Sequence, residues 1–302
     1  MLTNGQKAAR YLFYSVWAVL MTALTYVLGA VSLKTLRRKF GRAGYWTVTL
    51  ALSAGLFALQ FKLLSVSFFS LVLLVGVFTE LEEHHQSLNV SAFFTLVINS
   101  LVGAGAFVLW ATATGPKWSQ VVLSWIEQML KPLAEMNPNL EIKYFDLMLQ
   151  LPSIILIMWM GALYLAVLLE SRLLGEDETL SADALNMRKQ LGEFRLPDVC
   201  VWLFIASLLG AFGNFGNQTV EAIAANALNV SFMLFFFQGV GVVSKFFEKL
   251  RLAPFWQTLL MALIVIHLFL FVSALGLMDY WLDFRSRIAK GKGSSEEINE
   301  EI

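Results

Sequence analysis

The sequence predicts an all-α membrane protein, a bundle of about eight transmembrane helices. Of its 302 residues, 58% are hydrophobic and 15% are charged, whereas a soluble domain has about 25% charged residues. Apolar stretches recur along the chain, and several reach the roughly 20 residues that a helix needs to cross a bilayer. These stretches also lack the short-period alternation of a membrane β-barrel. We therefore expect helices, which satisfy their own backbone groups in lipid.

Eight apolar segments are the expected spans, although one of them could be miscounted and the number could be seven. The first follows Lys7 and Arg10 and exceeds a signal-peptide core of about 7–15 residues, so we expect it to be retained. The second, third and sixth are short for a perpendicular crossing. The expected spans are Tyr11–Val31, Tyr45–Leu59, Leu63–Phe78, Ala92–Ala111, Leu151–Leu169, Val199–Phe212, Glu221–Val243 and Pro254–Leu277.

We expect one polytopic membrane domain over residues 1–290, followed by an acidic, disordered tail at 291–302. Between spans four and five lies an insert at 113–150. Its residues Trp118, Val122, Trp125 and Met129 share one helix face, which indicates a helix in the membrane interface or a lid on the span ends. Residues 171–197 are expected to form a polar loop.

Basic residues suggest an orientation without fixing it. With eight spans, the basic loops Lys34–Arg42, Arg172–Arg195 and Lys245–Arg251 fall on one side, and the positive-inside rule places that side in the cytoplasm. Both termini would then lie outside, yet the segment after the last span is also basic. The orientation of the termini therefore stays open.

Several classes of protein are not expected. The formal net charge is zero, which gives no electrostatic reason to expect nucleic acid as a partner. Cys200 is the single cysteine and cannot form an internal disulfide. The sequence contains no nucleophile elbow, P-loop or zinc-protease motif. We therefore expect no enzyme activity, no cofactor and no ATPase within this chain.

The ligand-binding candidates are polar residues in or beside the last three spans. A glycine-broken segment that leads into a polar helix start can line a solute site, but it can also be an exposed turn with Asn217 or Thr219 as helix cap. Gln238 can contact a ligand or join two helices, and His267 can be a ligand or a hydrogen-bonded interior residue. The candidates are Asn214, Asn217, Gln218, Glu221, Asn226, Asn229, Gln238 and His267.

A second cluster follows span three, where Glu80, Glu82, Glu83, His84 and His85 occur together. Carboxylate and imidazole groups at helical spacing can hold a transition metal. A di-iron site needs two further carboxylate helices and a second Glu-x-x-His, which the sequence lacks. We therefore interpret this cluster as a solvated charged loop and expect no metal.

The partner-facing candidates lie in span two, on the amphipathic helix between spans four and five, and at the end of the last span. Small residues at four-residue spacing in span two let another helix approach closely, either within the bundle or from a partner. An Asp–Arg pair at the end of the last span can clamp a partner or simply end the span. The candidates are Ala51, Ala54, Gly55, Ala58, Trp118, Trp125, Asp279, Asp283 and Arg285.

Several of these segments carry a family resemblance. The runs Leu151–Leu174 and Phe194–Trp202, the pair Gln238-Gly239 and the closing Gly276…Asp279…Trp281…Asp283-Phe284-Arg285 resemble the YybS-like family of bacterial inner-membrane proteins. The resemblance covers about the C-terminal 190 residues. It implies a fold similar to the S-components of energy-coupling-factor transporters, which bind a small molecule and dock on a separate ATPase-driven scaffold; fold by itself does not fix function.

Two functions follow as expectations. The first is a membrane-embedded subunit of the bacterial inner membrane that binds or transports a small solute together with partner subunits. The alternative is a non-catalytic scaffold or assembly subunit that holds a membrane protein partner or self-associates. A membrane enzyme acting through Glu80–His85 is a third and weaker expectation.

Overall fold

The structure is a computed structural model that describes residues 4–84, 87–136, 143–174, 178–213, 215–250 and 253–288. Within these ranges every regular element is helical, with eleven α-helices and one short 3₁₀-helix, which confirms the predicted all-α class. Four helical segments are long and apolar enough to cross a membrane, or five if a bent pair is counted as one span, with shorter apolar helices at Tyr11–Leu24 and Asp198–Phe212.

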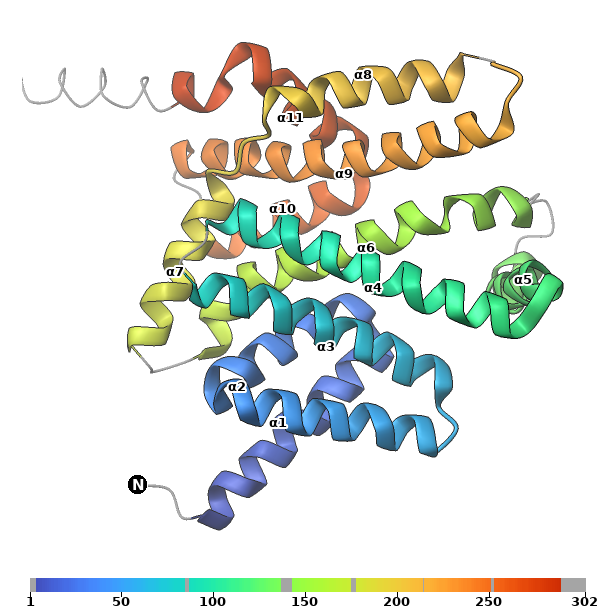
Figure 1. Cartoon of the computed structure of the whole chain (residues 1–302). Helices are drawn as coiled ribbons and strands as arrows, with labels where there is room; N and C mark the ends of the chain where they lie inside the picture. The colour runs from blue at the N-terminus through green and yellow to red at the C-terminus, as the bar shows by residue number, and fades with distance from the viewer. Residues whose placement is uncertain are drawn as a thin grey trace, which may run out of the picture. The chain divides into compact units, whose positions relative to one another are not determined.

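The chain divides into two compact units, residues 1–187 and 188–302. Unit 1 contains α1 (Asn4–Leu24), α2 (Tyr26–Ala58), α3 (Lys62–Glu83), α4 (Leu88–Thr114), η1 (Gly115–Lys117), α5 (Trp118–Met136) and α6 (Tyr144–Leu174) (Figure 1). Helix α7 (Glu178–Gly192) crosses the division. Unit 2 contains α8 (Asp198–Phe212), α9 (Gln218–Lys249), α10 (Pro254–His267) and α11 (Phe269–Leu282).

Helix α2 is bent at Gly41, which has a φ of 75°. Glycine adopts this left-handed region without steric cost. Before the bend, residues 26–40 run parallel to α3, since Tyr26 lies beside Ser70 and Arg37 beside Glu80. After the bend, residues 42–58 run antiparallel to α3. The Tyr45 hydroxyl donates to the carbonyl of Val72 at 2.7 Å on this side.

The first predicted span, Tyr11–Val31, was wrong as a single helix. The helix is interrupted at Thr25, which has extended backbone angles. Helices α1 and 26–40 then form a hairpin: the Gly29 backbone closely approaches Thr22 near the tip, and the Lys39 ammonium donates to the Tyr14 hydroxyl at 2.8 Å near the open end. Hydropathy does not detect this break because the residues next to it on both sides, 16–24 and 26–33, are mostly apolar.

The expected basic loop Lys34–Arg42 is also wrong, because these residues continue α2. Residues 29–37 are buried all round, so this arm of the hairpin lies at the centre of unit 1. It packs against α1, α3 and α6. Buried apolar side chains of the arm and of α3 include Leu33, Leu36, Phe68, Leu71, Val75 and Phe78.

Two further expectations are corrected. The polar loop 171–197 contains α7, although residues 175–177 lie outside the described ranges. The last predicted span, Pro254–Leu277, is not straight, since the helical segments Phe255–Val265 and Phe269–Leu282 are bent by 100° relative to each other. No proline or glycine stands at this bend, and the structure does not explain it.

In unit 2, α11 packs closely along α9. A Cβ atom added to Gly239 would lie 1.9 Å from the Val272 carbonyl oxygen, and one added to Gly276 would lie 1.9 Å from the Phe235 carbonyl oxygen. The two glycines therefore bring the backbones together, as small residues do between membrane helices. Leu196, Val201 and Phe235 form a buried cluster beside this contact.

Candidate functional site

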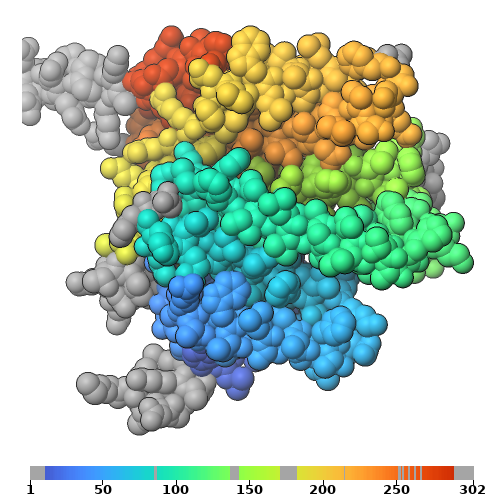
Figure 2. Space-filling view, in the orientation of Figure 1, coloured from blue at the N-terminus to red at the C-terminus, as the bar shows by residue number. Residues whose placement is uncertain are grey.

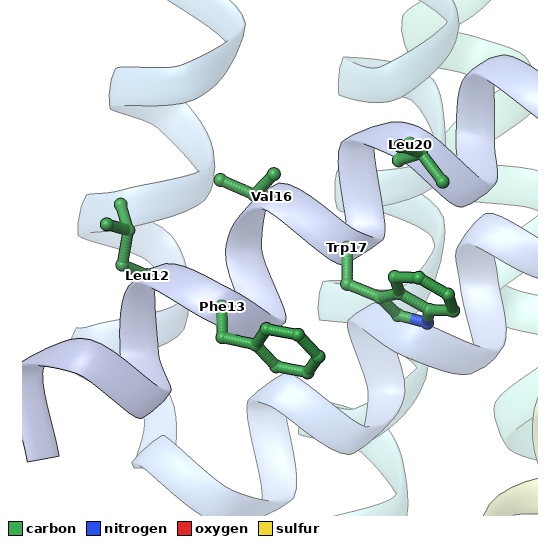
Figure 3. Close-up of a pocket in the computed structure, with 5 residues that line it drawn as sticks. All are labelled: Leu12, Phe13, Val16, Trp17 and Leu20. Carbon is green, nitrogen blue, oxygen red and sulfur yellow. The ribbon is translucent and has the colours of Figure 1, made fainter. Parts of the chain in front are cut away.

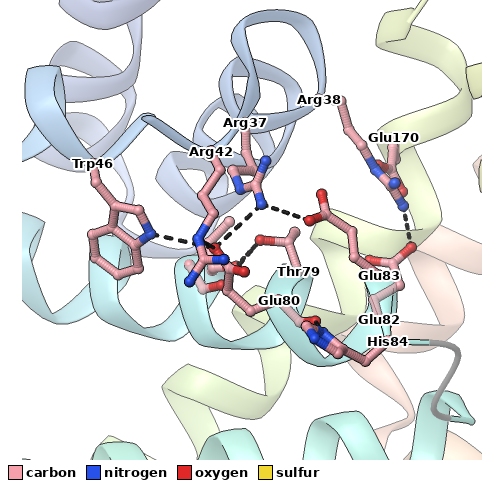
Figure 4. Close-up of polar contacts among 12 residues, drawn as sticks. Arg37, Arg38, Arg42, Trp46, Thr79, Glu80, Glu82, Glu83, His84 and Glu170 are labelled. Carbon is pink, nitrogen blue, oxygen red and sulfur yellow. Dashed lines mark hydrogen bonds and ion pairs between the residues drawn. The ribbon is translucent and has the colours of Figure 1, made fainter. Parts of the chain in front are cut away.

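The charged residues of α2 face carboxylates from α3 and α6 (Figure 4). The Lys34 ammonium lies 2.7 Å from Glu170 and 3.2 Å from Glu82. The Arg38 guanidinium donates to Glu170 at 3.0 Å and also binds Glu82. Two cations and two carboxylates thus alternate in a closed ring, which we call the ion-pair ring.

The ion-pair ring is enclosed by the protein. Lys34 and Glu170 have no exposed side-chain surface, and the Glu82 side chain is 4% exposed. A buried charge is costly unless it is paired, and two positive groups here match two negative ones. The ring therefore keeps four ionisable groups inside a bundle at zero net charge.

A second set of charges extends from the ring toward solvent. Arg37 binds Glu80 at 3.2 Å and Glu83 at 2.7 Å, and the exposed Arg42 binds Glu80 at 3.0 Å. The predicted solvated loop around Glu80–His85 is therefore a helix end whose carboxylates hold α2. His85 lies outside the described residues, and His84 bonds the Glu80 carbonyl of its own helix.

The tip of the α1–α2 hairpin carries a different polar group. The Tyr26 hydroxyl lies 2.9 Å from the Ser70 hydroxyl, and the Trp159 indole N–H lies 2.9 Å and 3.0 Å from the same two oxygens. From α4, the Asn99 amide donates to the Ser70 carbonyl at 3.4 Å. We call these four residues the polar junction.

The polar junction lies halfway along two helices. Trp159 is at the midpoint of α6, and Asn99 is close to the midpoint of α4. Asn99 is 2% exposed, and its Oδ1 atom accepts no hydrogen bond from the part of the chain that the structure describes. Buried polar atoms are normally paired, so this acceptor is available to a ligand or a water molecule.

The ring and the junction are two layers on the same three helices. The same spacing, eleven or twelve residues, separates Tyr26 from Arg38, Ser70 from Glu82, and Trp159 from Glu170. At a rise of 1.5 Å per residue the layers are roughly 18 Å apart. The hairpin thus enters beside the charged ends of α3 and α6 and ends near the middle of α4 and α6.

Most predicted ligand candidates lie elsewhere. Asn217 caps α9, accepting from the backbone N–H groups of Thr219 and Val220, and Gln218 is exposed beside it. Glu221 occupies the first turn of α9 and is half-buried, as are Asn226 and Asn229. Asn226 donates to the Ala222 carbonyl at 2.8 Å. Asn214 lies outside the described residues.

Gln238 joins helices instead of facing a cavity. Its carbonyl accepts from the Leu196 backbone N–H at 3.0 Å, and its amide donates to the Gly276 carbonyl at 2.9 Å. The residue is 3% exposed, so the helix-packing interpretation describes it. His267 is exposed at the end of α10 and contacts the Leu263 carbonyl, which corrects the expectation of an interior residue.

The closing motif binds its own chain. Arg285 donates to Asp279 at 3.0 Å and to the carbonyls of Phe194, Gly192 and Gln238. Asp279 and Arg285 are 2% and 7% exposed, so these two do not present a surface to a partner. Asp283 is half-exposed and forms an ion pair with Arg195 at 2.6 Å.

The remaining partner candidates are accessible. Ala51, Ala54, Gly55 and Ala58 are exposed, and the space where a Gly55 Cβ would lie is open. Trp118 packs edge-on against Phe107. The ring centroids of Trp125 and Trp110 lie 5.4 Å apart, and half of the Trp125 surface is exposed.

A shallow hollow on α1 offers no alternative polar site. Its lining residues all project from one side of the helix (Figure 3), and all are apolar. Such a surface suits lipid tails better than a polar solute. The lining residues are Leu12, Phe13, Val16, Trp17 and Leu20. Among the described residues no three His, Cys, Asp or Glu side chains gather closely enough to hold a metal ion.

Neither the ion-pair ring nor the polar junction was predicted from the sequence. A signal was present for each: Glu170 directly follows the apolar segment Leu151–Leu169, and Asn99 interrupts the middle of Ala92–Ala111. An ionisable or amide side chain within a span is a functional candidate by default. Their partners could not be predicted because they come from helices distant in sequence.

The apolar helices, the buried charges and the mid-helix polar group define a multi-pass helical membrane protein. The chain belongs to the family described as "Predicted membrane protein (DUF2232)", which matches residues 11–280. No curated protein and no solved structure matches the chain.

Proposed function

We propose that this protein is a membrane-embedded subunit that binds a small neutral polar solute and works with partner subunits in the bacterial inner membrane. The observation that carries this proposal is the polar junction at the tip of the α1–α2 hairpin. The resemblance to the YybS-like family and, through it, to S-components of transporters agrees with this reading.

The hairpin has the form of a re-entrant element. Its tip stops near the middle of α4 and α6, and a helix break at that depth is tolerated where protein or a water-filled cavity surrounds it. Transporters place solute sites near the bilayer midplane at such discontinuous helices. The break at Thr25 therefore supports a solute site in unit 1.

The chemistry of the junction indicates the solute class. The junction contains a hydroxyl pair, an indole N–H and an amide, with no charged side chain. The unsatisfied acceptor is Asn99 Oδ1, which requires an N–H or O–H donor. A charged solute would have no counter-charge here, so a neutral molecule with a donor group fits best.

Native mass spectrometry of the full chain in mild detergent tests this proposal. We expect a reproducible small-molecule adduct on the wild type. The adduct should be absent from N99L and present on a smaller fraction of Y26F. The matched control is N89L, since Asn89 is exposed on the same helix. An unliganded wild type, or an adduct that N99L retains, would contradict the proposal.

A second candidate function is supported by the small-residue face of α2. Ala51, Ala54, Gly55 and Ala58 are exposed and could accept a close helix contact from a partner or a second copy. In this case the chain is an assembly subunit. Gentle-detergent pull-down would then recover a stoichiometric partner from wild type but not from G55L, whatever small molecules are present.

A further inference from the structure

Helix α5 leaves the end of α4 at a sharp turn. Gly115 has a φ of 72°, a value that favours glycine, and η1 connects the two helices. Figure 1 shows α5 end-on while α4 and α6 lie across the view. The helix therefore runs across the ends of two membrane helices and not along them.

The apolar face of α5 extends beyond the protein that supports it. Near its start, Val122 and Ile126 on this face are buried at 7% and 9% exposure. Farther along, the same face continues through Met129, Leu133 and Met136, which are 71%, 49% and 84% exposed. An apolar strip of this kind in water would be unfavourable by about 25 cal/mol per Å².

The opposite face of α5 is polar. Glu127, Gln128, Lys131 and Glu135 are exposed there, and Lys131 lies 3.9 Å from Glu135. A helix with one apolar and one charged face is suited to the boundary between lipid headgroups and hydrocarbon. The apolar face of α5 would then contact the lipid chains, and the polar face would contact headgroups and water.

The surface of α4 leads into that boundary. Leu101, Val108 and Leu109 on α4 are 69%, 58% and 73% exposed, as expected of side chains that face lipid. Figure 2 shows the outer surfaces of α4 and α5 as a continuous band. At their meeting point Trp110 and Trp125 lie 5.4 Å apart, and tryptophan is enriched at membrane interfaces.

We infer that α5 lies in the bilayer interface, with Trp125, Met129, Leu133 and Met136 inserted among the lipid chains and the Glu127–Lys131 side toward water. The charges on this side balance, because Lys117, at the end of η1, and Lys131 are matched by Glu127 and Glu135. Insertion therefore depends on apolar burial and needs no anionic lipid. This inference concerns a lipid surface and does not rest on the proposed solute site.

Depth measurements on single labelled cysteines in the reconstituted full chain test this inference. Cys200 is the single native cysteine, so C200S provides the background. A fluorescent label on M129C or M136C should be quenched by a lipid with a spin label near the headgroup and protected from aqueous iodide. The matched control K131C should show the reverse, with at least a several-fold difference between the two faces.

The lipid dependence separates this inference from its rivals. Quenching of M129C should be the same in vesicles of phosphatidylcholine and in vesicles with added phosphatidylglycerol, and it should not change with salt. Equal iodide access to M129C and K131C would overturn the inference, as would protection of M129C from both quenchers, which is the signature of a covering protein.

Discussion

Lys34 and Glu170 form an ion pair of 2.7 Å, and neither side chain has any exposed surface. The pair joins the inner arm of the α1–α2 hairpin to α6, and Glu82 and Arg38 close it into a ring with α3. The position of the hairpin in unit 1 therefore depends on charges as well as on apolar packing.

Breaking the ion-pair ring on one side should be strongly destabilising. K34M leaves two carboxylates against one arginine inside the protein, and loss of one partner of a buried pair costs about 3–5 kcal/mol. K34M/E170Q removes one charge of each sign, so its cost should be smaller than the sum of the two single variants. The apparent free energy of unfolding in mixed micelles measures both.

The control for the ring is the exposed pair Lys131–Glu135, whose side chains are 73% and 67% exposed. K131A should change stability by less than about 1 kcal/mol. If K34M lowered the free energy of unfolding no more than K131A does, the ring would contribute nothing to the stability of the fold.

The close contact of α9 with α11 predicts a steric effect at Gly239. The added methyl group of G239A would meet the backbone oxygen of Val272, and backbone cannot move aside as a flexible side chain can. We expect overpacking to lower the free energy of unfolding by about 1–3 kcal/mol. G55A is the control, because nothing lies near its new methyl group and alanine favours helix by about 1 kcal/mol.

Replacement of Gln238 should loosen unit 2. Q238L keeps the size of the side chain approximately but leaves the Leu196 N–H without its acceptor and removes the donor to Gly276. A buried unsatisfied polar group costs about 1–3 kcal/mol. Hydrogen exchange at Leu196 should therefore accelerate, whereas Q218L, at an exposed position, should have no effect. Unchanged protection at Leu196 in Q238L would show that the amide is dispensable.

The end of α11 predicts a pH effect. Hydrogen bonds from Ser286 and the Arg195 guanidinium lower the pKa of Asp283. Because the folded pKa lies below the unfolded value of about 3.9, the stabilisation is complete above that value and is lost as the pH falls through the folded pKa. The melting temperature of the wild type should be higher than that of D283N at pH 7, and the two melting temperatures should converge in strong acid. A difference that stays constant down to pH 2 would show that ionisation of Asp283 is not its cause.

Parts of the fold could be predicted from local pattern. Each of the third, fourth, fifth and seventh predicted spans lies within one long helix of the structure, because uninterrupted apolar composition is a property of the segment itself. The amphipathic helix after Gly115 was predicted from its spacing. Asn217, which caps α9, was one of two residues predicted as possible caps. Such features depend on residues within one or two helical turns.

Composition and periodicity were thus enough to predict the helical membrane class, the long spans and the amphipathic character of α5. Only the assembled helices show that Lys34 is fully buried and that the Arg38 side chain is 11% exposed, because the carboxylates that neutralise them come from α3 and α6. They also show that Thr25 ends a hairpin beside Trp159 and that Gln238 joins helices. The role of a charged or amide side chain cannot be predicted from its own segment, since the free energy of burying it depends on the partners that distant helices provide.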